Sequence, residues 1–283
     1  MGLCVLYYEL LQGRRNIMKK LLIGALISVA TQALTLPAHI QEEAFIAAHL
    51  VDKDIEAILD KYSDQLGRLV DKVRATERRK HGVWQFDWLP GYYIKYNVDR
   101  VYKRDLVADC IERNGLDLMH TPVKQFYHIK GRSQKLHSLN YVVIVEKVHD
   151  DKKSYKKRMS LEQVKQFCKI IEETGHISTY MSNYLRLEND KLSFIDTDGT
   201  FNKNFYVRGI MDLLNCSLGS YYEPEALDYI IDRIAQSFVK LPTDKKKYTK
   251  DRVESHLAQQ HGNVAHAVRS KLAARISHYR NLL

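Results

Sequence analysis

The chain has 283 residues and a mass of 33.0 kDa, enough for one large domain or two smaller ones with their own hydrophobic cores. Hydrophobic residues make up 45% of it and charged residues 28%, which excludes a disordered tail and a collagen-like fibre. The formal net charge of +10 allows an acidic partner without requiring one. The cysteines include no C-x-x-C pair, so neither a disulfide-rich scaffold nor a common structural zinc site is expected.

The N-terminal region carries the pattern of an export signal. Residues 18–33 begin with a methionine and two lysines, continue with an apolar run of about ten residues and end in small residues, as in a secretory signal peptide. We therefore expect 1–33 to be a leader absent from the mature protein, with Met18 as the start and cleavage after Ala33. The run is shorter than the about 20 residues that span a bilayer, so an exported chain without a transmembrane anchor is expected. The alternative is an apolar helix buried at a domain edge.

Residues 39–81 are predicted to form an N-terminal helical extension. From Ile40 to about Arg79, apolar residues recur at steps of three and four, and the opposite face is charged. That face carries both signs of charge, which favours a packing helix over a helix on a membrane surface.

Residues 82–148 are predicted to form a small lobe of strands with one helix. Short aromatic and β-branched runs indicate the strands, and the helical spacing ends at Gly115, a residue typical of a helix C-cap. The predicted elements are a hairpin of 83–88 and 92–97, a helix from 101 to 114, and strands at 123–129 and 141–148.

Residues 149–283 are predicted to form a helical lobe that contains one small hairpin. After a charged connector, Ser160 and Gln163 have the spacing of a capping box, and the helix that they open ends at Gly175. Pro224 begins a further helix. The predicted elements are a hairpin of 184–187 and 192–195 and helices at 160–174, 224–238 and 263–279. The sequence thus predicts an α+β protein in two lobes.

Three pieces of the sequence could meet at one site. Lys95 lies in an aromatic strand, where it points to the face opposite its neighbours. Asn183 comes just before a strand, and Asp196 and Asp198 come just after one, beside a glycine that allows a tight turn. Amide and carboxylate oxygens are the ligands that Mg²⁺ prefers, together with the phosphates of a substrate.

The order of these residues resembles the protein-kinase-like superfamily, in particular its choline-kinase and aminoglycoside-phosphotransferase branch. In that family a strand lysine meets the nucleotide phosphates and a helix glutamate, a loop H-R-D-x-x-x-x-N supplies a base and a metal ligand, and a later Asp binds the metal. Here Lys95 is followed by the octet His176–Asn183 and then by Ile-Asp-Thr-Asp, which is similar to the branch's I-D-x-[DE]. The resemblance covers roughly residues 83–240. It implies a two-lobed kinase-like fold that binds ATP and Mg²⁺ between its lobes.

The resemblance also implies roles for individual residues. The strand lysine would bind the nucleotide beside a carboxylate of the following helix, and the end of the strand at 141–147 would lie near the adenine. The implied nucleotide-binding residues are Lys95, Glu112 (or Asp109 in its place), Glu146 and Val148, and the implied metal ligands are Asn183, Asp196 and Asp198.

The expected catalytic loop departs from the family pattern. Ser178 stands where the catalytic Asp belongs, five residues before Asn183, and no G-x-G-x-x-G precedes Lys95. Ser178 and His176 are therefore the candidate catalytic positions. A positioned base contributes roughly 10²–10⁴ in rate, so phosphotransfer to a protein or small-molecule acceptor is expected to be weak or absent, as in a pseudokinase. The alternative is a secreted, non-catalytic α+β interaction protein with no nucleotide site.

The remaining patterns indicate turns or solvated surface. The segment from Asp196 resembles the start of an EF-hand loop, but it has no glutamate at the twelfth position. The lysine-rich runs 152–158 and 245–250 lack interleaved aromatic residues at a spacing known for RNA binding, which argues against nucleic acid as a partner. The late histidines show no clear i, i+4 pair, so no metal site is expected among them.

Overall fold

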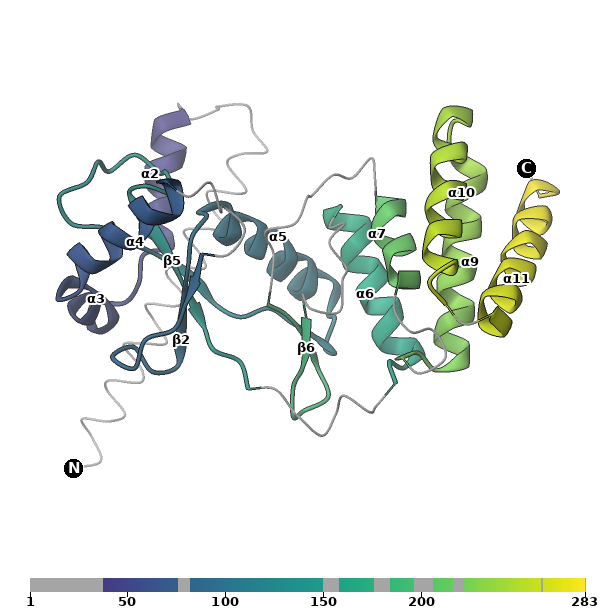
Figure 1. The fold of residues 1–283 in the computed structure, drawn as a ribbon, viewed down its shortest axis with the longest axis horizontal. Helices are drawn as coiled ribbons and strands as arrows, with labels where there is room; N and C mark the ends of the chain where they lie inside the picture. The colour runs from purple at the N-terminus through teal and green to yellow at the C-terminus, as the bar shows by residue number, and fades with distance from the viewer. Residues whose placement is uncertain are drawn as a thin grey trace.

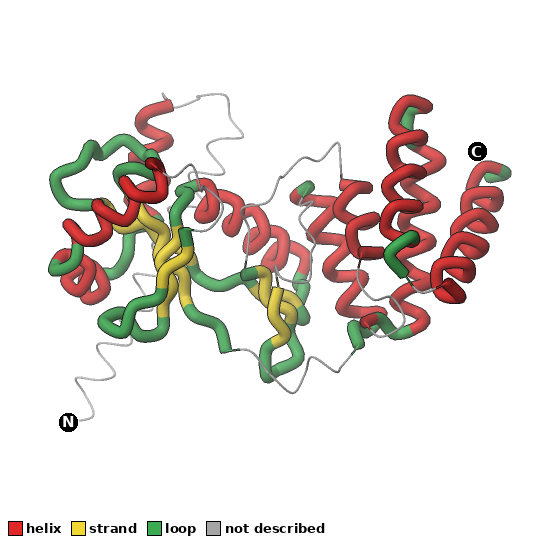
Figure 2. Tube along the Cα trace, in the orientation of Figure 1, coloured by secondary structure: helices red, strands yellow, loops and turns green. Residues whose placement is uncertain are grey.

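The computed structural model describes residues 38–75, 82–149, 158–175, 184–195, 206–215, 221–260 and 262–282, which form an α+β protein with two small sheets. The elements follow one another along the long axis of the molecule (Figures 1 and 2). The larger sheet and the N-terminal helices lie at one end, the smaller sheet lies in the middle, and the last helices lie at the other end. The α+β class predicted from the sequence is confirmed.

The helices and strands have the following bounds. The helices are α2 (Ala38–Ala48), α3 (Lys53–Asp60), α4 (Ser63–Ala75), α5 (Asp99–Asn114), α6 (Leu161–Thr174), α7 (Tyr206–Asp212), the 3₁₀ helix η4 (Leu213–Asn215), α9 (Pro224–Lys240), α10 (Thr243–Leu257) and α11 (Gly262–Arg280). The strands are β1 (Val83–Trp84), β2 (Tyr92–Lys95), β3 (Met119–His120), β4 (Lys124–His128), β5 (Tyr141–Glu146), β6 (Tyr184–Arg186) and β7 (Leu192–Phe194).

The larger sheet has the order β1-β2-β5-β4, is antiparallel throughout and is covered on both faces. Strand β5, which lies between β2 and β4, is accordingly buried from Tyr141 to Val145, and only its last residue, Glu146, is exposed. One face packs against α3 and α4 in a cluster that includes Leu59, Leu66, Val70, Ile94, Tyr127, Val142 and Ile144. The other face packs against α2 and α5 in a cluster of Ile46, Val101, Phe126, Tyr141, Val143 and Val145.

The outer edge of β4 pairs with the chain between α2 and α3. The amide of Phe126 donates to the carbonyl of His49 at 2.7 Å, and the amide of Val51 donates to the carbonyl of Phe126 at 3.0 Å. The His49 ring lies 2.6 Å from the carboxylate of Asp105 on α5. Burial lowers the pKa of His49, but the hydrogen bond and charge of Asp105 outweigh it and leave this pKa raised. The helical spacing predicted from Ile40 to Arg79 is therefore interrupted, because this segment is drawn out to the sheet edge.

The smaller sheet has the order β3-β7-β6. Strands β6 and β7 form the antiparallel hairpin that the sequence predicts, with Tyr184 opposite Phe194. The short strand β3 was not predicted, and it pairs in parallel with β7, Met119 opposite Leu192. This pairing attaches the segment after α5 directly to the hairpin.

The ends of two helices follow their local sequence signals. The Ser160 hydroxyl accepts a hydrogen bond from the amide of Gln163, whose side chain in turn accepts from the amide of Ser160, so the predicted capping box is confirmed. Gly115 and Gly175 end α5 and α6 with φ of 60° and 73°, the left-handed conformation that only glycine adopts without strain.

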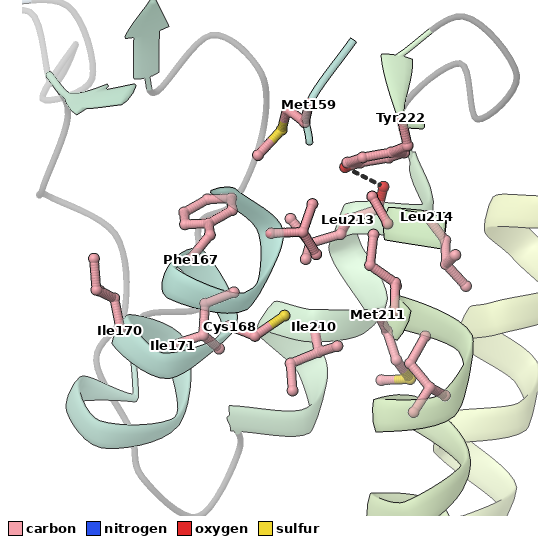
Figure 3. Packing of buried hydrophobic residues seen from close by; sticks show 14 of the residues in the cluster. Met159, Phe167, Cys168, Ile170, Ile171, Ile210, Met211, Leu213, Leu214 and Tyr222 are labelled. Atoms are coloured by element: carbon pink, nitrogen blue, oxygen red, sulfur yellow. Dashed lines mark hydrogen bonds between the residues drawn. The ribbon is translucent and has the colours of Figure 1, made fainter. Parts of the chain in front are cut away.

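The helical half has its own hydrophobic core between α6, α7 and α9 (Figure 3). Phe167 and Ile171 of α6 belong to the same buried cluster as Ile210 of α7 and Leu213 of η4, and the ring of Phe167 points towards Met159. The hydroxyl of Tyr222 donates to the carbonyl of Leu213 at 3.0 Å, so this fully buried phenol is satisfied within the core.

A buried carboxylate joins α7 to α10. Asp212 is only 1% exposed, and its Oδ1 accepts from Arg252 Nε at 2.7 Å and from His256 Nε2 at 3.0 Å. Arg252 Nη2 lies 2.5 Å from the same oxygen. Both partners lie one turn apart on α10, so this single carboxylate fixes one face of that helix.

The last helix, α11, packs along α9 through apolar and charged contacts. Lys271 pairs with Asp228 at 2.6 Å, and the Tyr279 hydroxyl donates to Asp232 at 2.8 Å. None of the described helices, α11 included, is long and apolar enough to cross a membrane.

Candidate functional site

Two buried lysines from the larger sheet meet at the end of the β6–β7 hairpin. Lys95 of β2 is 8% exposed and Lys124 of β4 is 1% exposed. The Nζ atom of each donates to the backbone carbonyl of Ile195, both at 3.3 Å. We call Lys95, Lys124 and this carbonyl the lysine junction. It links residues 100 positions apart in the sequence.

Strand register places both lysines on the same face of the sheet. Lys95 lies opposite Val143 of β5, and Lys124 lies opposite Val145, two residues further along the same strand. Side chains of directly opposed residues share a face, so both lysines lie on the face that carries Val143 and Val145. That face is the one covered by α5. The ammonium groups therefore extend past the end of the α5-covered core to reach Ile195.

Further hydrogen bonds hold β3 and its flanking residue to the hairpin next to the junction. The hydroxyl of Thr121 donates to the carbonyl of Phe194 at 3.4 Å. His120 Nδ1 and the hydroxyl of the fully buried Ser193 lie 2.9 Å apart. Burial lowers the pKa of His120, which favours its neutral form. The position of Ile195 is thus fixed by backbone pairing and by neutral hydrogen bonds.

Two arginines of α5 lie against the strands that carry the lysines. Arg100 is buried, and its Nε donates to the carbonyl of Tyr96, the residue after Lys95, at 3.2 Å. Arg104 Nε donates to the carbonyl of Pro122, two residues before Lys124, at 3.3 Å, and its Nη1 also meets Asp105. These two arginines thus tie α5 to the backbone next to the strands that carry Lys95 and Lys124.

The carboxylates expected to pair with Lys95 lie elsewhere on α5. Glu112 and Asp109 are both exposed, and among the described residues neither forms an ion pair. Burial and the nearby charges of Asp105 and Glu112 raise the pKa of Asp109. The buried face of α5 instead carries Val101, Val107 and Cys110. The rotation of the helix that buries this stripe turns Glu112 outwards.

The residues expected near the adenine lie at the end of β5. Glu146 is exposed, and its Oε2 accepts from the amide of Val123 at 3.3 Å. The negative charge of Glu146 raises the pKa of His120, against the larger lowering by burial. Val148 is half-buried in the chain that leaves the sheet.

The other predicted site residues lie outside the described residues. These are the candidate catalytic positions and the candidate metal ligands, namely His176, Ser178, Asn183, Asp196 and Asp198. Ile195 is the last described residue before Asp196, so the lysine junction ends where the Ile-Asp-Thr-Asp motif continues. Within the described part of the chain, no three histidine, cysteine or acidic side chains form a group that could hold a metal ion.

A cavity of about 430 Å³ opens on the opposite side of the sheet. It is lined by Arg74, Tyr96, Asn97, His137, Ser138 and Leu139. Tyr96 and Leu139 pack with the α3–α4 cluster, whereas the lysines lie on the α5 face. The cavity and the lysine junction are thus separate features.

Lys124 is the residue at this site that the sequence analysis missed. Lysine side chains are seldom fully buried, and the sequence gives no direct sign that Lys124 is. The signal that could have indicated its burial is the alternation of side chains along a strand. Lys124 and Phe126 are two residues apart and so lie on the same face of β4, and the apolar Phe126 indicates that this face is buried.

Comparison of this chain with protein-family models, with curated proteins and with solved structures finds no match.

Proposed function

We propose that this chain is an exported, kinase-like protein that binds Mg²⁺-ATP at the lysine junction, with weak or absent phosphotransfer. One observation carries the proposal: Lys95 Nζ lies 3.3 Å from the carbonyl of Ile195, the residue that precedes Asp196. A strand lysine and an Ile-Asp-x-Asp motif must come together in a nucleotide site of this kind. These two pieces are far apart in the sequence, so their approach is not a consequence of local structure.

The order of elements supports the same proposal. The lysine strand β2 is followed by helix α5, by the antiparallel strands β4 and β5, by α6, and by a hairpin that ends just before Asp196. This is the order that the resemblance implies for 82–148 as a strand-rich lobe and 149–283 as a helical lobe. The described helices of the extension at 39–81, α2 to α4, would then be an addition that packs on both faces of the sheet.

The proposed roles follow from charge and chemistry. Buried ammonium groups fit phosphate oxygens, so Lys95 would hold the polyphosphate chain of the nucleotide. Asn183, Asp196 and Asp198 would hold Mg²⁺, which supplies positive charge to the phosphates when bound. Ser178 in place of an aspartate would leave the acceptor hydroxyl of a protein or small molecule without a base, so transfer would be slow.

Calorimetric titration with Mg²⁺-ATP tests the nucleotide site. Asp196→Ala should remove the Mg²⁺-dependent part of the affinity, whereas Ser178→Ala should leave the affinity nearly unchanged, because Ser178 occupies the place of a group that acts only during transfer. Equal affinity in the wild type and Asp196→Ala would contradict the metal assignment.

A radiolabel-transfer assay tests catalysis separately. Ser178→Asp restores a carboxylate five residues before Asn183 and should raise transfer from ATP above the wild-type rate. Binding without transfer in either protein would support a pseudokinase. Absence of both binding and transfer would favour the alternative, a non-catalytic interaction protein without a nucleotide site.

A further inference from the structure

An apolar groove lies between the last three helices, at the end of the molecule opposite the larger sheet (Figure 1). Its volume is about 300 Å³. Its apolar lining is formed by Ile234 and Phe238 of α9, Val253 of α10, and Leu272 and Ile276 of α11. Ile234 and Val253 are buried, whereas the other three side chains are only half-buried. We call this space the three-helix groove, and its apolar walls are open to solvent.

The two ends of the three-helix groove differ in charge. Residues 258–261 join α10 to α11, and Glu254 of α10 accepts a hydrogen bond from Arg269 Nε of α11 at 2.7 Å, so the two helices run antiparallel. This ion pair compensates both charges at the end near the turn. Lys250 and Arg280 line the groove further from the turn, about one and three helical turns beyond the pair. Among the described residues, neither of them has an ionic partner.

The two helices that carry these cations are strongly basic. Between residues 243 and 280 the sequence has nine lysines and arginines and three acidic residues, and α11 has no acidic residue at all. Lysine and arginine lay their methylene stems along apolar surface and keep the charged group in water. Lys250 and Arg280 therefore suit the border between an apolar groove and solvent. A ligand group that lies at this border is favoured if it is negatively charged.

The size of the three-helix groove limits what can occupy it. An α-helix with its side chains is about 10 Å across, so two turns of a partner helix would fill about 850 Å³, well above the volume of the groove. A second copy that used the same face would bring two sets of basic helices together, and like charges would oppose the contact. A volume of about 300 Å³ with mostly apolar walls is instead at the lower end of small-molecule sites.

We propose that the three-helix groove binds a long-chain alkyl carboxylate, an amphiphile with one apolar chain and one anionic head group. The chain lies against Phe238, Leu272 and Ile276, and the carboxylate meets Lys250 and Arg280 at the end away from the turn. This site is separate from the lysine junction, so the proposal does not depend on nucleotide binding and stands if the protein binds no ATP.

Calorimetric titration of the full chain with dodecanoate, below the concentration at which it forms micelles, tests the proposal. Dodecanoate should fill a single saturable site. Each buried methylene contributes about fourfold in affinity, so decanoate, which is two methylenes shorter, should bind about 15-fold more weakly. Dodecyltrimethylammonium has the same chain with a cationic head group, and it should bind at least tenfold more weakly than dodecanoate because Lys250 and Arg280 repel it.

Two variants with matched controls locate the site. Ala273 is exposed and lines the groove, so Ala273→Phe should fill it and weaken dodecanoate binding at least tenfold, whereas Ala274→Phe, at an exposed position outside the lining, should bind as the wild type does. Lys250→Gln should weaken binding about two- to fivefold, the range of an exposed ion pair. Its control is Lys247→Gln, at an exposed position of α10 outside the lining, and its affinity should equal that of the wild type.

Several results would overturn the proposal. These are no binding of dodecanoate, equal affinity for the cationic amphiphile, or unchanged affinity in both Ala273→Phe and Lys250→Gln. A wild-type dimer in light scattering that separates in Ala273→Phe but not in Ala274→Phe would assign the groove to a second copy instead. Binding to phosphatidylglycerol vesicles without binding of free dodecanoate would assign the basic helices to a membrane surface. If Ala273→Phe does not fold by circular dichroism, Lys250→Gln and the comparison of head groups decide.

Discussion

Asp212 should be among the most sensitive positions of the helical half. Its carboxylate is 1% exposed and accepts three N–H groups, two from Arg252 and one from His256. Removing one partner of a buried ion pair costs roughly 3–5 kcal/mol, because the remaining charge is left without compensation. The Arg252 side chain keeps 19% of its surface in water, which places the expected cost of Asp212→Asn at the lower end, about 3 kcal/mol. In a chain of this size, that corresponds to a fall of about 6 °C in Tm.

Urea denaturation followed by circular dichroism measures this cost. Asp228→Asn is the matched control, because Asp228 also pairs with a basic residue, Lys271, but both side chains are about half exposed. An exposed pair contributes about 0–1 kcal/mol, so the control should lose little stability. The double variant Asp212→Asn with Arg252→Met should show a coupling free energy of about 1–3 kcal/mol between the two positions. A loss in Asp212→Asn no larger than that in Asp228→Asn would refute the reasoning.

Three further measurements follow from the structure. Hydrogen bonds from Lys169, Arg113 and Asn114 lower the pKa of Glu173 from 4.5 to about 2, so Glu173→Gln should be less stable than the wild type at neutral pH. This difference should shrink as the pH falls below 4.5 and through about 2, and a difference that stays constant between pH 5 and about pH 2 would contradict the assignment. Burial raises the pKa of Cys110 to about 11 and also raises that of Cys168. Neither thiol should therefore react with iodoacetamide at about pH 8 until urea is added, as measured by peptide mass spectrometry. Labelling of the folded protein at either cysteine would refute their burial. Residues 18–40 fused to a reporter that is active only outside the cytoplasm should yield an active reporter, and an inactive fusion would refute the export signal.

The parts of the fold that were predicted correctly are those with a local cause. The capping box at Ser160 and the left-handed glycines 115 and 175 each depend on a few neighbouring residues, and all three are confirmed. The two hairpins were likewise indicated by turns between short strand patterns. What the sequence could not provide is pairing between distant segments. The short strand β3 and the segment at His49–Val51 have no strand pattern of their own and are extended only because a partner strand lies beside them.

The candidate site was predictable to the same degree. Lys95 was identified because its strand is short, aromatic and followed by a helix, and these are local features. Lys124 was missed because the burial of a lysine depends on the register of β4 against β5, which no short pattern encodes. Glu112, or Asp109 in its place, was implied by the resemblance as a carboxylate of the helix after Lys95, but the rotation of α5 is set by the packing of Val107 and Cys110 against the core. A candidate residue can be recognised from the sequence around it, whereas the direction of its side chain depends on how the whole chain packs.

The pairing of His49–Val51 with β4 also has a consequence for how the chain reaches its folded state. This segment is made about 75 residues before Phe126, the residue with which it pairs. During synthesis it must therefore wait without its partner, and contacts between residues so far apart in sequence form slowly. Until it docks, the outer edge of β4 presents unpaired amides and carbonyls that could recruit a strand from another molecule. In the folded protein, the backbone of His49–Val51 pairs with this edge at Phe126.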